Sequence, residues 1–200
     1  LAIGDLDANG ANDVLFGGNQ VPIKVVYFSP NSFDYEIKQY PATNFFMQGC
    51  NMSDIDGDGD LDIFACNDVA AAHILMNQGD TFTEGYQNID LNTVPPSDNS
   101  GNYASLWTDF DDDGDLDLYI TKCRQGVTSS SDPRRINLLY INDGQGNYTE
   151  QGATFGLNSG AQGWTSDFGD IDNDNDFDIV TVNHDVPSNV WVNNGDNTFQ

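Results

Sequence analysis

A nine-residue acidic segment that recurs four times is the feature that most constrains the fold of this chain. Each copy has Asp at positions 1, 3 and 9, Asp or Asn at position 5 and an apolar residue at position 2. Two more apolar residues follow position 9 directly. The copies occupy residues 5–13, 54–62, 109–117 and 170–178, so their starts lie 49, 55 and 61 residues apart. Self-similarity at this spacing indicates a fold made of equivalent units placed side by side.

A second signature follows each acidic segment and predicts a β-hairpin. An apolar run, an Asn, a Gly and an aromatic residue recur in residues 75–82, 140–148 and 191–199. Apolar runs joined by Asn/Asp-Gly punctuation are typical of tight hairpins. The first unit keeps its apolar runs at residues 25–28 and 33–35 but has Ser29-Pro30-Asn31-Ser32 at the turn, so we interpret it as a degenerate copy.

Each unit therefore predicts strand, acidic loop, strand, variable loop, strand, turn and strand. Four short antiparallel strands per 50 to 60 residues are typical of a β-propeller blade. We expect an all-β chain, a single propeller segment over residues 1–200 with about four blades at 1–45, 46–101, 102–161 and 162–200. A β-sandwich would not repeat both signatures in register, and β-helical solenoids have shorter repeats. Because the chain starts and stops inside blades, we expect a piece of a larger ring rather than a small closed one.

The charge of the chain limits its partners. Against 32 Asp and Glu there are 6 Lys and Arg, which gives a net charge of -26, yet 12% of the residues are aromatic. Disordered chains are poor in aromatic residues, so the chain is expected to fold. A nucleic-acid ligand or an anionic membrane surface would be repelled. No apolar run is long enough for direct membrane insertion. A fold with this charge repels itself unless cations are bound.

Oxygen ligands at alternate positions of a short loop predict a calcium site. Calcium takes six to eight oxygens in flexible geometry, whereas magnesium prefers a rigid octahedron and retains water. Side chains at positions 1, 3, 5 and 9 and the carbonyl at position 7 would supply them, and Gly or Asn at position 6 permits a left-handed turn. An EF-hand needs Glu at position 12, where these loops have Phe16, Ala65, Ile120 and Thr181. Merely solvated turns are the alternative, which four copies in register disfavour. The candidate ligands, loop by loop, are Asp5, Asp7, Asn9, Ala11 and Asp13; Asp54, Asp56, Asp58, Asp60 and Asp62; Asp109, Asp111, Asp113, Asp115 and Asp117; Asp170, Asp172, Asp174, Asp176 and Asp178.

The loop and hairpin together resemble a known family. An Asp-x-Asp-x-Asp-Gly-x-x-Asp loop with an Asn-x-Gly-x-x-Phe hairpin behind it is similar to the FG-GAP/VCBS repeats of integrin-α-type propellers, closest to the bacterial VCBS and cartilage-acidic-protein-like group. The segments that carry this resemblance best are residues 107–119 and 137–144. The resemblance implies Ca²⁺ in each loop of a secreted propeller, commonly of seven blades. Loop 5–13 departs most, with Asn9 at position 5 and no apolar residue at position 8, so its site is expected to be the weakest of up to four.

Residues suited to catalysis are sparse. His73 and His184 have no serine, acid or paired-histidine spacing around them, and no nucleophile elbow or zinc pattern is present, so we expect no enzyme activity from this segment. A hairpin about loop 54–62 would place Cys50 and Cys66 opposite each other, which leaves a cross-strand disulfide or free thiols open, with Cys123 unpaired. We expect Trp164, like the other aromatic residues, to be core rather than a sugar platform.

Two long connections are the expected binding surface. Residues 88–102 lead into the third unit, and residues 121–137 carry Arg124, Arg134 and Arg135 on what should be the same rim. Long irregular loops often build binding surfaces, although these arginines can equally neutralise neighbouring acids. We expect a secreted or cell-surface module for adhesion or scaffolding that binds an unknown extracellular protein or glycan, within a larger propeller chain. The alternatives are a lectin and an accessory domain of a larger secreted hydrolase.

Overall fold

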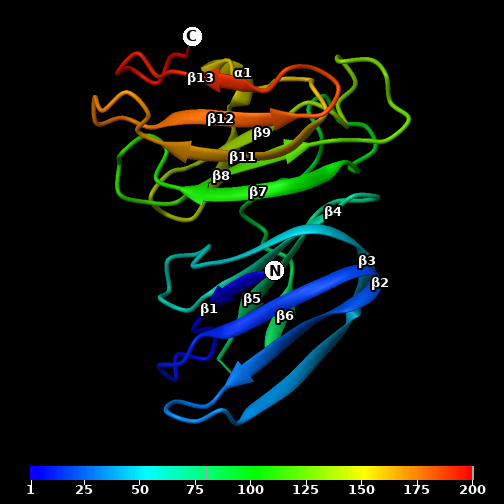
Figure 1. The fold of residues 1–200 in the computed structure, drawn as a ribbon, viewed down its shortest axis with the longest axis vertical. Coiled ribbons are helices and arrows are strands. Elements are labelled where there is room, and N and C mark those ends of the chain that lie inside the picture. Colours follow the sequence, from blue (N-terminus) through cyan, green and yellow to red (C-terminus); the bar gives the residue numbers. More distant parts are fainter. Residues whose placement is uncertain (80, 200) are drawn as a thin grey trace.

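The computed structural model describes residues 1–79 and 81–199, with only the backbone course at 41–44; Asp80 of the second hairpin and Gln200 lie outside the described residues. The chain is all-β, and every paired strand is antiparallel to its neighbour (Figure 1). A single turn of helix, α1 (Gly152–Phe155), interrupts the described strands. No helix in this part of the chain is long and apolar enough to cross a membrane.

The strands follow the order expected from the repeat. Units 1 and 2 form one sheet in chain order, made of β1 (Ala2–Gly4), β2 (Asp13–Phe28), β3 (Tyr35–Ser53), β4 (Asp62–Asn67), β5 (His73–Asn77) and β6 (Phe82–Glu84). Unit 3 forms a second sheet of β7 (Asn102–Thr108), β8 (Asp117–Lys122), β9 (Leu138–Asn142) and β10 (Tyr148–Glu150). Unit 4 forms a third of β11 (Gly163–Gly169), β12 (Asp178–Asn183) and β13 (Asn189–Trp191).

The first unit contains two strands within the long segment β2. The backbone N–H of Phe28 donates to Asp13 Oδ1 at 2.9 Å, although these residues are the two ends of β2. A straight strand of this length would separate its ends by roughly 50 Å at about 3.3 Å per residue. β2 therefore doubles back, with Gln20 at φ 56° in the bend. Strand β3 is also composite, because its first half pairs with β2 and its second half with β4.

Among the described residues, three apolar cores lie in series between successive units. The first joins units 1 and 2 and includes Leu15, Val25 and Ile63. The second joins units 2 and 3, and the third joins units 3 and 4 around Phe110 and Tyr119. Alternate residues of one strand serve two cores, as Ile63 and Phe64 do, because successive side chains of a strand point to opposite faces. The strands of units 2 and 3 are thus buried on both faces.

This alternation explains why no disulfide joins Cys50 and Cys66. The register pairs Cys50 with Ala65, not with Cys66, so the two thiols point to opposite faces and lie in different cores. All three cysteines are free and buried. Of the two possibilities that the sequence left open, the structure has the free thiols, because the register differs by one residue from the one that a bridge requires.

The outer face of unit 4 exposes side chains whose equivalents in unit 3 are buried. Ile171 is 48% exposed, whereas Phe110 at the same loop position is 3% exposed. Val190 on β13 is 53% exposed, whereas the equivalent Leu139 on β9 is fully buried. The apolar pattern of unit 4 is therefore that of a sheet with a neighbour on each face, and no described residue covers the second face.

Candidate metal centre

Each acidic segment forms the connection between the first two strands of its unit. Position 6 has a positive φ in all four loops, at Gly10, Gly59, Gly114 and Asn175, which confirms the predicted left-handed turn. Position 4 also has a positive φ in every copy, at Ala8, Gly57, Asp112 and Asn173, and the sequence pattern did not predict this. Two left-handed residues two positions apart curl the loop back on itself, so that its carboxylates converge.

The carboxylate at position 9 is the buried anchor of each loop. Its Oδ2 accepts the backbone N–H of position 2 at 2.7 to 2.9 Å in every copy. Its Oδ1 accepts a second N–H from the hairpin strand, as Asp62 does from Asn77 at 2.7 Å and Asp117 from Asn142 at 2.8 Å. These acids are essentially inaccessible to solvent. Position 9 thus joins the acidic loop to the hairpin, a structural role that the sequence did not reveal.

The Asn of the hairpin signature completes this connection. Asn77 Nδ2 donates to the carbonyl of Leu61, the loop residue at position 8, at 3.1 Å, and Asn142 and Asn193 make the equivalent bonds. Asn77 Oδ1 accepts the N–H of Gly79 within the turn. The recurrence of Asn therefore reflects a bridge to the loop as well as the shape of the turn.

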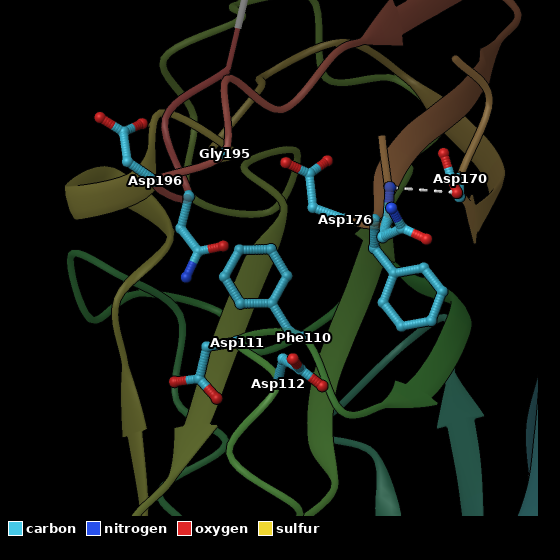
Figure 2. A pocket seen from close by; sticks show the side chains of 10 residues that line it. Phe110, Asp111, Asp112, Asp170, Asp176, Gly195 and Asp196 are labelled. Atoms are coloured by element: carbon cyan, nitrogen blue, oxygen red, sulfur yellow. Dashed lines mark hydrogen bonds between the residues drawn. The ribbon is translucent and has the colours of Figure 1, made fainter. Parts of the chain in front are cut away.

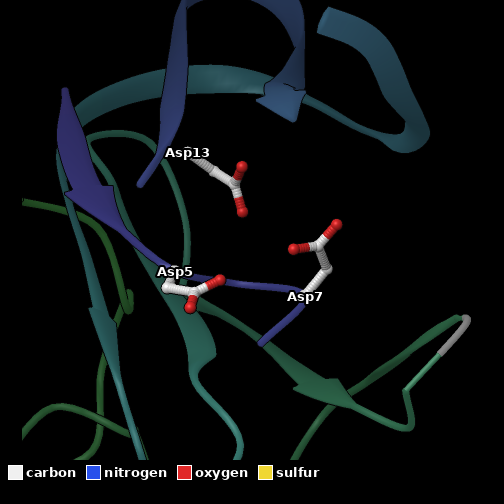
Figure 3. Close-up of side chains that lie close together, drawn as sticks. All are labelled: Asp5, Asp7 and Asp13. Atoms are coloured by element: carbon white, nitrogen blue, oxygen red, sulfur yellow. The ribbon is translucent and has the colours of Figure 1, made fainter. Parts of the chain in front are cut away.

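Positions 1 and 3 gather with a third carboxylate in each loop. In loop 5–13 ligand atoms of Asp5, Asp7 and Asp13 lie within 4.8 Å of one another, and Figure 3 shows the three side chains converging. The same separation holds for three further groups: Asp54, Asp56 and Asp58; Asp109, Asp111 and Asp113; Asp170, Asp172 and Asp178. The structure thus brings positions 1 and 3 together in all four loops. The third carboxylate comes from position 5 in loops 54–62 and 109–117 and from position 9 in loops 5–13 and 170–178.

The first carboxylate also shapes its loop. Asp109 accepts the N–H of Asp113 at 2.9 Å and that of Gly114 at 3.0 Å, and Asp5, Asp54 and Asp170 accept the same pair of N–H groups. Asn9 differs from the acids at its position, because its amide Nδ2 donates to Asp7 and to the carbonyl of Phe28. Ala11 offers only its backbone carbonyl. The greater weakness expected of loop 5–13 stays a prediction.

Several loop oxygens fit a hard cation. Asp111 Oδ1, Asp115 Oδ1 and Asp176 Oδ1 are shielded from solvent and have no hydrogen-bond partner among the described residues. Burial and the neighbouring carboxylates raise the pKa of Asp56 and Asp111. Burial also raises the pKa of Asp62 to about 6 and that of Asp117 to about 7, against the opposing effect of the N–H donors. A bound Ca²⁺ would favour the charged form of each and supply the missing partner.

A carboxylate-lined cavity separates successive loops. The space between loops 109–117 and 170–178 measures about 540 Å³ and is closed by Gly195, Asp196 and Asn197 of the last hairpin. Figure 2 shows Phe110 at its centre, with Asp111, Asp112 and Asp176 around it. An equivalent cavity of about 360 Å³ lies between loops 54–62 and 109–117. Both cavities favour cations over anions, because negatively charged carboxylates line them.

The three arginines of the long insertion are paired within the chain. Arg124 lies 3.6 Å from Asp68, and Arg134 bonds to Asp132 at 2.8 Å and approaches Asp98 at 3.7 Å, which shows that the two insertions meet as expected. Arg135 is buried and donates to Asp185 and to the carbonyls of residues 127, 128 and 160. Its burial removes Arg135 from the candidate partner surface; a partner role for Arg124 and Arg134 stays a prediction.

The remaining candidates divide between core and surface. His73 Nδ1 donates to Glu84 Oε1 at 2.6 Å, and the His73 ring stacks on Phe45, as a structural histidine does. Trp107 packs against Phe64 and Tyr148 in the second core, as predicted. Trp164 contradicts the prediction of a core residue, because it is 52% exposed.

Comparison with known proteins agrees with this geometry. The sequence profile described as "FG-GAP-like repeat" matches residues 54–120 and 109–181, which include three of the four acidic loops and the strands around them. No curated protein matches the chain. The matched region covers more than half of the sequence and includes the loops at 54–62, 109–117 and 170–178 and the hairpins of units 2 and 3. The chain therefore belongs to the FG-GAP-like repeat family.

Proposed function

We propose that the chain is a calcium-stabilised β-propeller segment that acts outside the cell as a protein-interaction module. The observation that carries this proposal is the loop geometry, in which four equivalent sets of carboxylates converge, and loops 109–117 and 170–178 hold shielded oxygens without a hydrogen-bond partner among the described residues. Calcium would bridge these oxygens and offset part of the net charge of -26. The abundant free calcium of extracellular fluids suits such sites, and FG-GAP-like repeats occur in extracellular and surface proteins.

Propeller architecture is supported by the packing of the sheets. Each of the three cores lies between consecutive units, so each unit buries one face against the next. The exposed apolar faces at both ends, represented by Ile3 and Val190, correspond to faces that the middle units bury. We infer that further units of the same kind complete a larger ring, for which the family suggests seven blades.

We propose a binding role without catalysis. The pair most suggestive of chemistry is Cys123 Sγ, 3.5 Å from His184 Nε2. Burial raises the pKa of Cys123 to about 11, so the thiol stays protonated at neutral pH. A nucleophilic cysteine requires the opposite shift.

Removal of calcium tests the proposal. A site at a free calcium concentration one hundred times its Kd adds about 2.7 kcal/mol of stability, so EDTA should lower the Tm by several degrees per occupied site. Magnesium at the same concentration should restore little of this loss. Asp111→Asn should reduce the calcium-dependent part, whereas Asp34→Asn, an exposed acid outside the loops, should not. An unchanged melting curve in EDTA would refute the calcium assignment.

The interaction role has its own test. The calcium-loaded protein is screened by surface plasmon resonance against purified extracellular-matrix and cell-surface proteins. We expect at least one partner whose binding is lost in EDTA and weakened by Arg124→Ala or Arg134→Ala. Failure to bind any of them, with a folded calcium-loaded protein, would contradict the protein-binding role.

A further inference from the structure

A pocket at the end of the sheets opposite the acidic loops is built from repeat-equivalent positions. It measures about 310 Å³, near the lower end of the roughly 300 to 1,000 Å³ typical of small-ligand sites. Gln48, Tyr103 and Trp164 line it, and each lies six residues before its acidic loop. Three further lining residues, Asp68, Cys123 and His184, each lie 14 residues after the start of the loop. Strand β7 packs against both β3 and β11 and brings these positions together.

A β-bulge displaces each of the first three residues from its ladder. The register of β7 passes from Asn102 directly to Ala104, so Tyr103 is the extra residue. That of β11 passes from Gly163 to Thr165 and leaves out Trp164, and that of β3 contains the same irregularity between Met47 and Cys50. Bulges re-aim side chains and are common beside functional sites. Here three of them aim chemically different side chains at one pocket.

Trp164 offers a flat apolar surface to a ligand. Its indole is 52% exposed and stacks on the His184 ring, with centroids 5.5 Å apart and an interplanar angle of 28°. Packing against His184 covers one face and fixes the ring. The free surface can receive the apolar face of a sugar ring by stacking.

Asp68 supplies the polar contact. It is 8% exposed, its Oδ2 accepts a bond from Gln48 Nε2 at 3.3 Å, and its Oδ1 has no hydrogen-bond partner among the residues described. A shielded acceptor that has an ion pair at 3.6 Å but no hydrogen bond is incompletely satisfied, so a ligand hydroxyl that donates to it would be favoured. Arg124 NH1, 3.6 Å from Oδ1, balances the charge of Asp68. A neutral hydroxyl-bearing ligand therefore suits the pocket better than a free cation or anion does.

We propose that this pocket binds a neutral pyranose ring of a glycan, which stacks on Trp164 and donates a hydroxyl hydrogen bond to Asp68 Oδ1. The inference goes beyond the proposed protein-interaction role and adds a glycan as a second class of ligand. It does not involve the acidic loops, because the pocket lies at the opposite end of the strands.

The test uses the calcium-loaded protein, a glycan array, and titration with the methyl pyranosides of glucose, galactose, mannose and N-acetylglucosamine. At least one pyranose should bind and quench tryptophan fluorescence. Trp164→Ala and Asp68→Asn should each weaken binding about tenfold or more, while Trp164→Phe should retain most of it. Phe33→Ala, a fully exposed aromatic residue outside the pocket, is the matched control and should bind like the wild type.

Three results would overturn the inference: no pyranose bound on the array or in titration, binding unchanged by Trp164→Ala, or binding of a lysine- or arginine-rich peptide that sugars do not displace. Trp164 is exposed, so its variant is expected to fold even if Asp68→Asn does not. The Tm with and without EDTA is measured in the same samples. Sugar binding with a calcium-independent Tm would contradict the calcium proposal alone, and a calcium-dependent Tm without sugar binding would contradict this inference alone.

Discussion

The apolar residue at position 2 of each loop provides a matched pair of substitutions that tests the serial packing of the units. Ile55 is almost fully buried in the core between units 2 and 3, whereas Ile171, the same residue at the equivalent position of unit 4, is 48% exposed. Ile→Ala at a buried site costs about 2 to 5 kcal/mol, through lost apolar burial and the cavity left behind. At a half-exposed site without a facing sheet the cost should be about 1 kcal/mol or less.

These energies translate into a clear thermal difference. For a chain of this size about 1 kcal/mol shifts the Tm by roughly 2 to 4 °C. Ile55→Ala should therefore lower the Tm by roughly 4 to 20 °C, and Ile171→Ala by less than about 4 °C. Differential scanning calorimetry at constant free calcium measures both, with bound calcium determined in each variant to exclude loss of a metal site. Equal losses of Tm in the two variants would refute the reasoning that the apolar residue at position 2 of each loop packs against the following unit.

Three further predictions concern the cysteines, the buried Lys122 and the backbone strain at Ala8. Thiol titration of the denatured, unreduced protein should give three free cysteines per chain. A value of one would show that two of the cysteines form a disulfide. Lys122 is buried, with Nζ 3.1 Å from Asn102 Oδ1, and burial lowers its pKa to about 8 from an ordinary 10.5. Because the unfolded chain then binds more protons between these values, stability should rise with pH from about 8 to 10.5, by roughly 3 kcal/mol relative to Lys122→Met, which lacks this rise. Ala8 has φ 54°, so Ala8→Gly should stabilise the protein by about 1 kcal/mol in chemical denaturation; destabilisation would mean that the left-handed turn is unstrained.

The repeat pattern predicted the features that depend on local chemistry. The acidic loops, the antiparallel strands around them and the left-handed residue at position 6 follow from alternating carboxylates and from Gly or Asn at a fixed place. Position 12 residues such as Ile120 lie in strands, as the argument against an EF-hand required. These predictions succeeded because turn geometry is decided by a few neighbouring residues.

Features that depend on register were not predictable from the pattern. The register is set at the loop, where Asp62 pairs with Ser53 and not with Asp54, and this offsets Cys50 from Cys66; a bulge of β11 turns Trp164 outward. A bulge leaves no mark in hydrophobic periodicity when the residues around it are polar or small. The anchoring role of position 9 was also missed, because an Asp that accepts two buried N–H groups has the same sequence signature as an Asp that binds metal.

Calcium stoichiometry tests the central claim most directly. Isothermal titration of the metal-free chain with Ca²⁺ should give four bound ions, with the weakest at loop 5–13. Asp7→Asn, Asp56→Asn, Asp111→Asn and Asp172→Asn should each remove one. Absence of binding at millimolar free calcium, or a stoichiometry that these four variants leave unchanged, would contradict the assignment of the acidic loops as calcium sites.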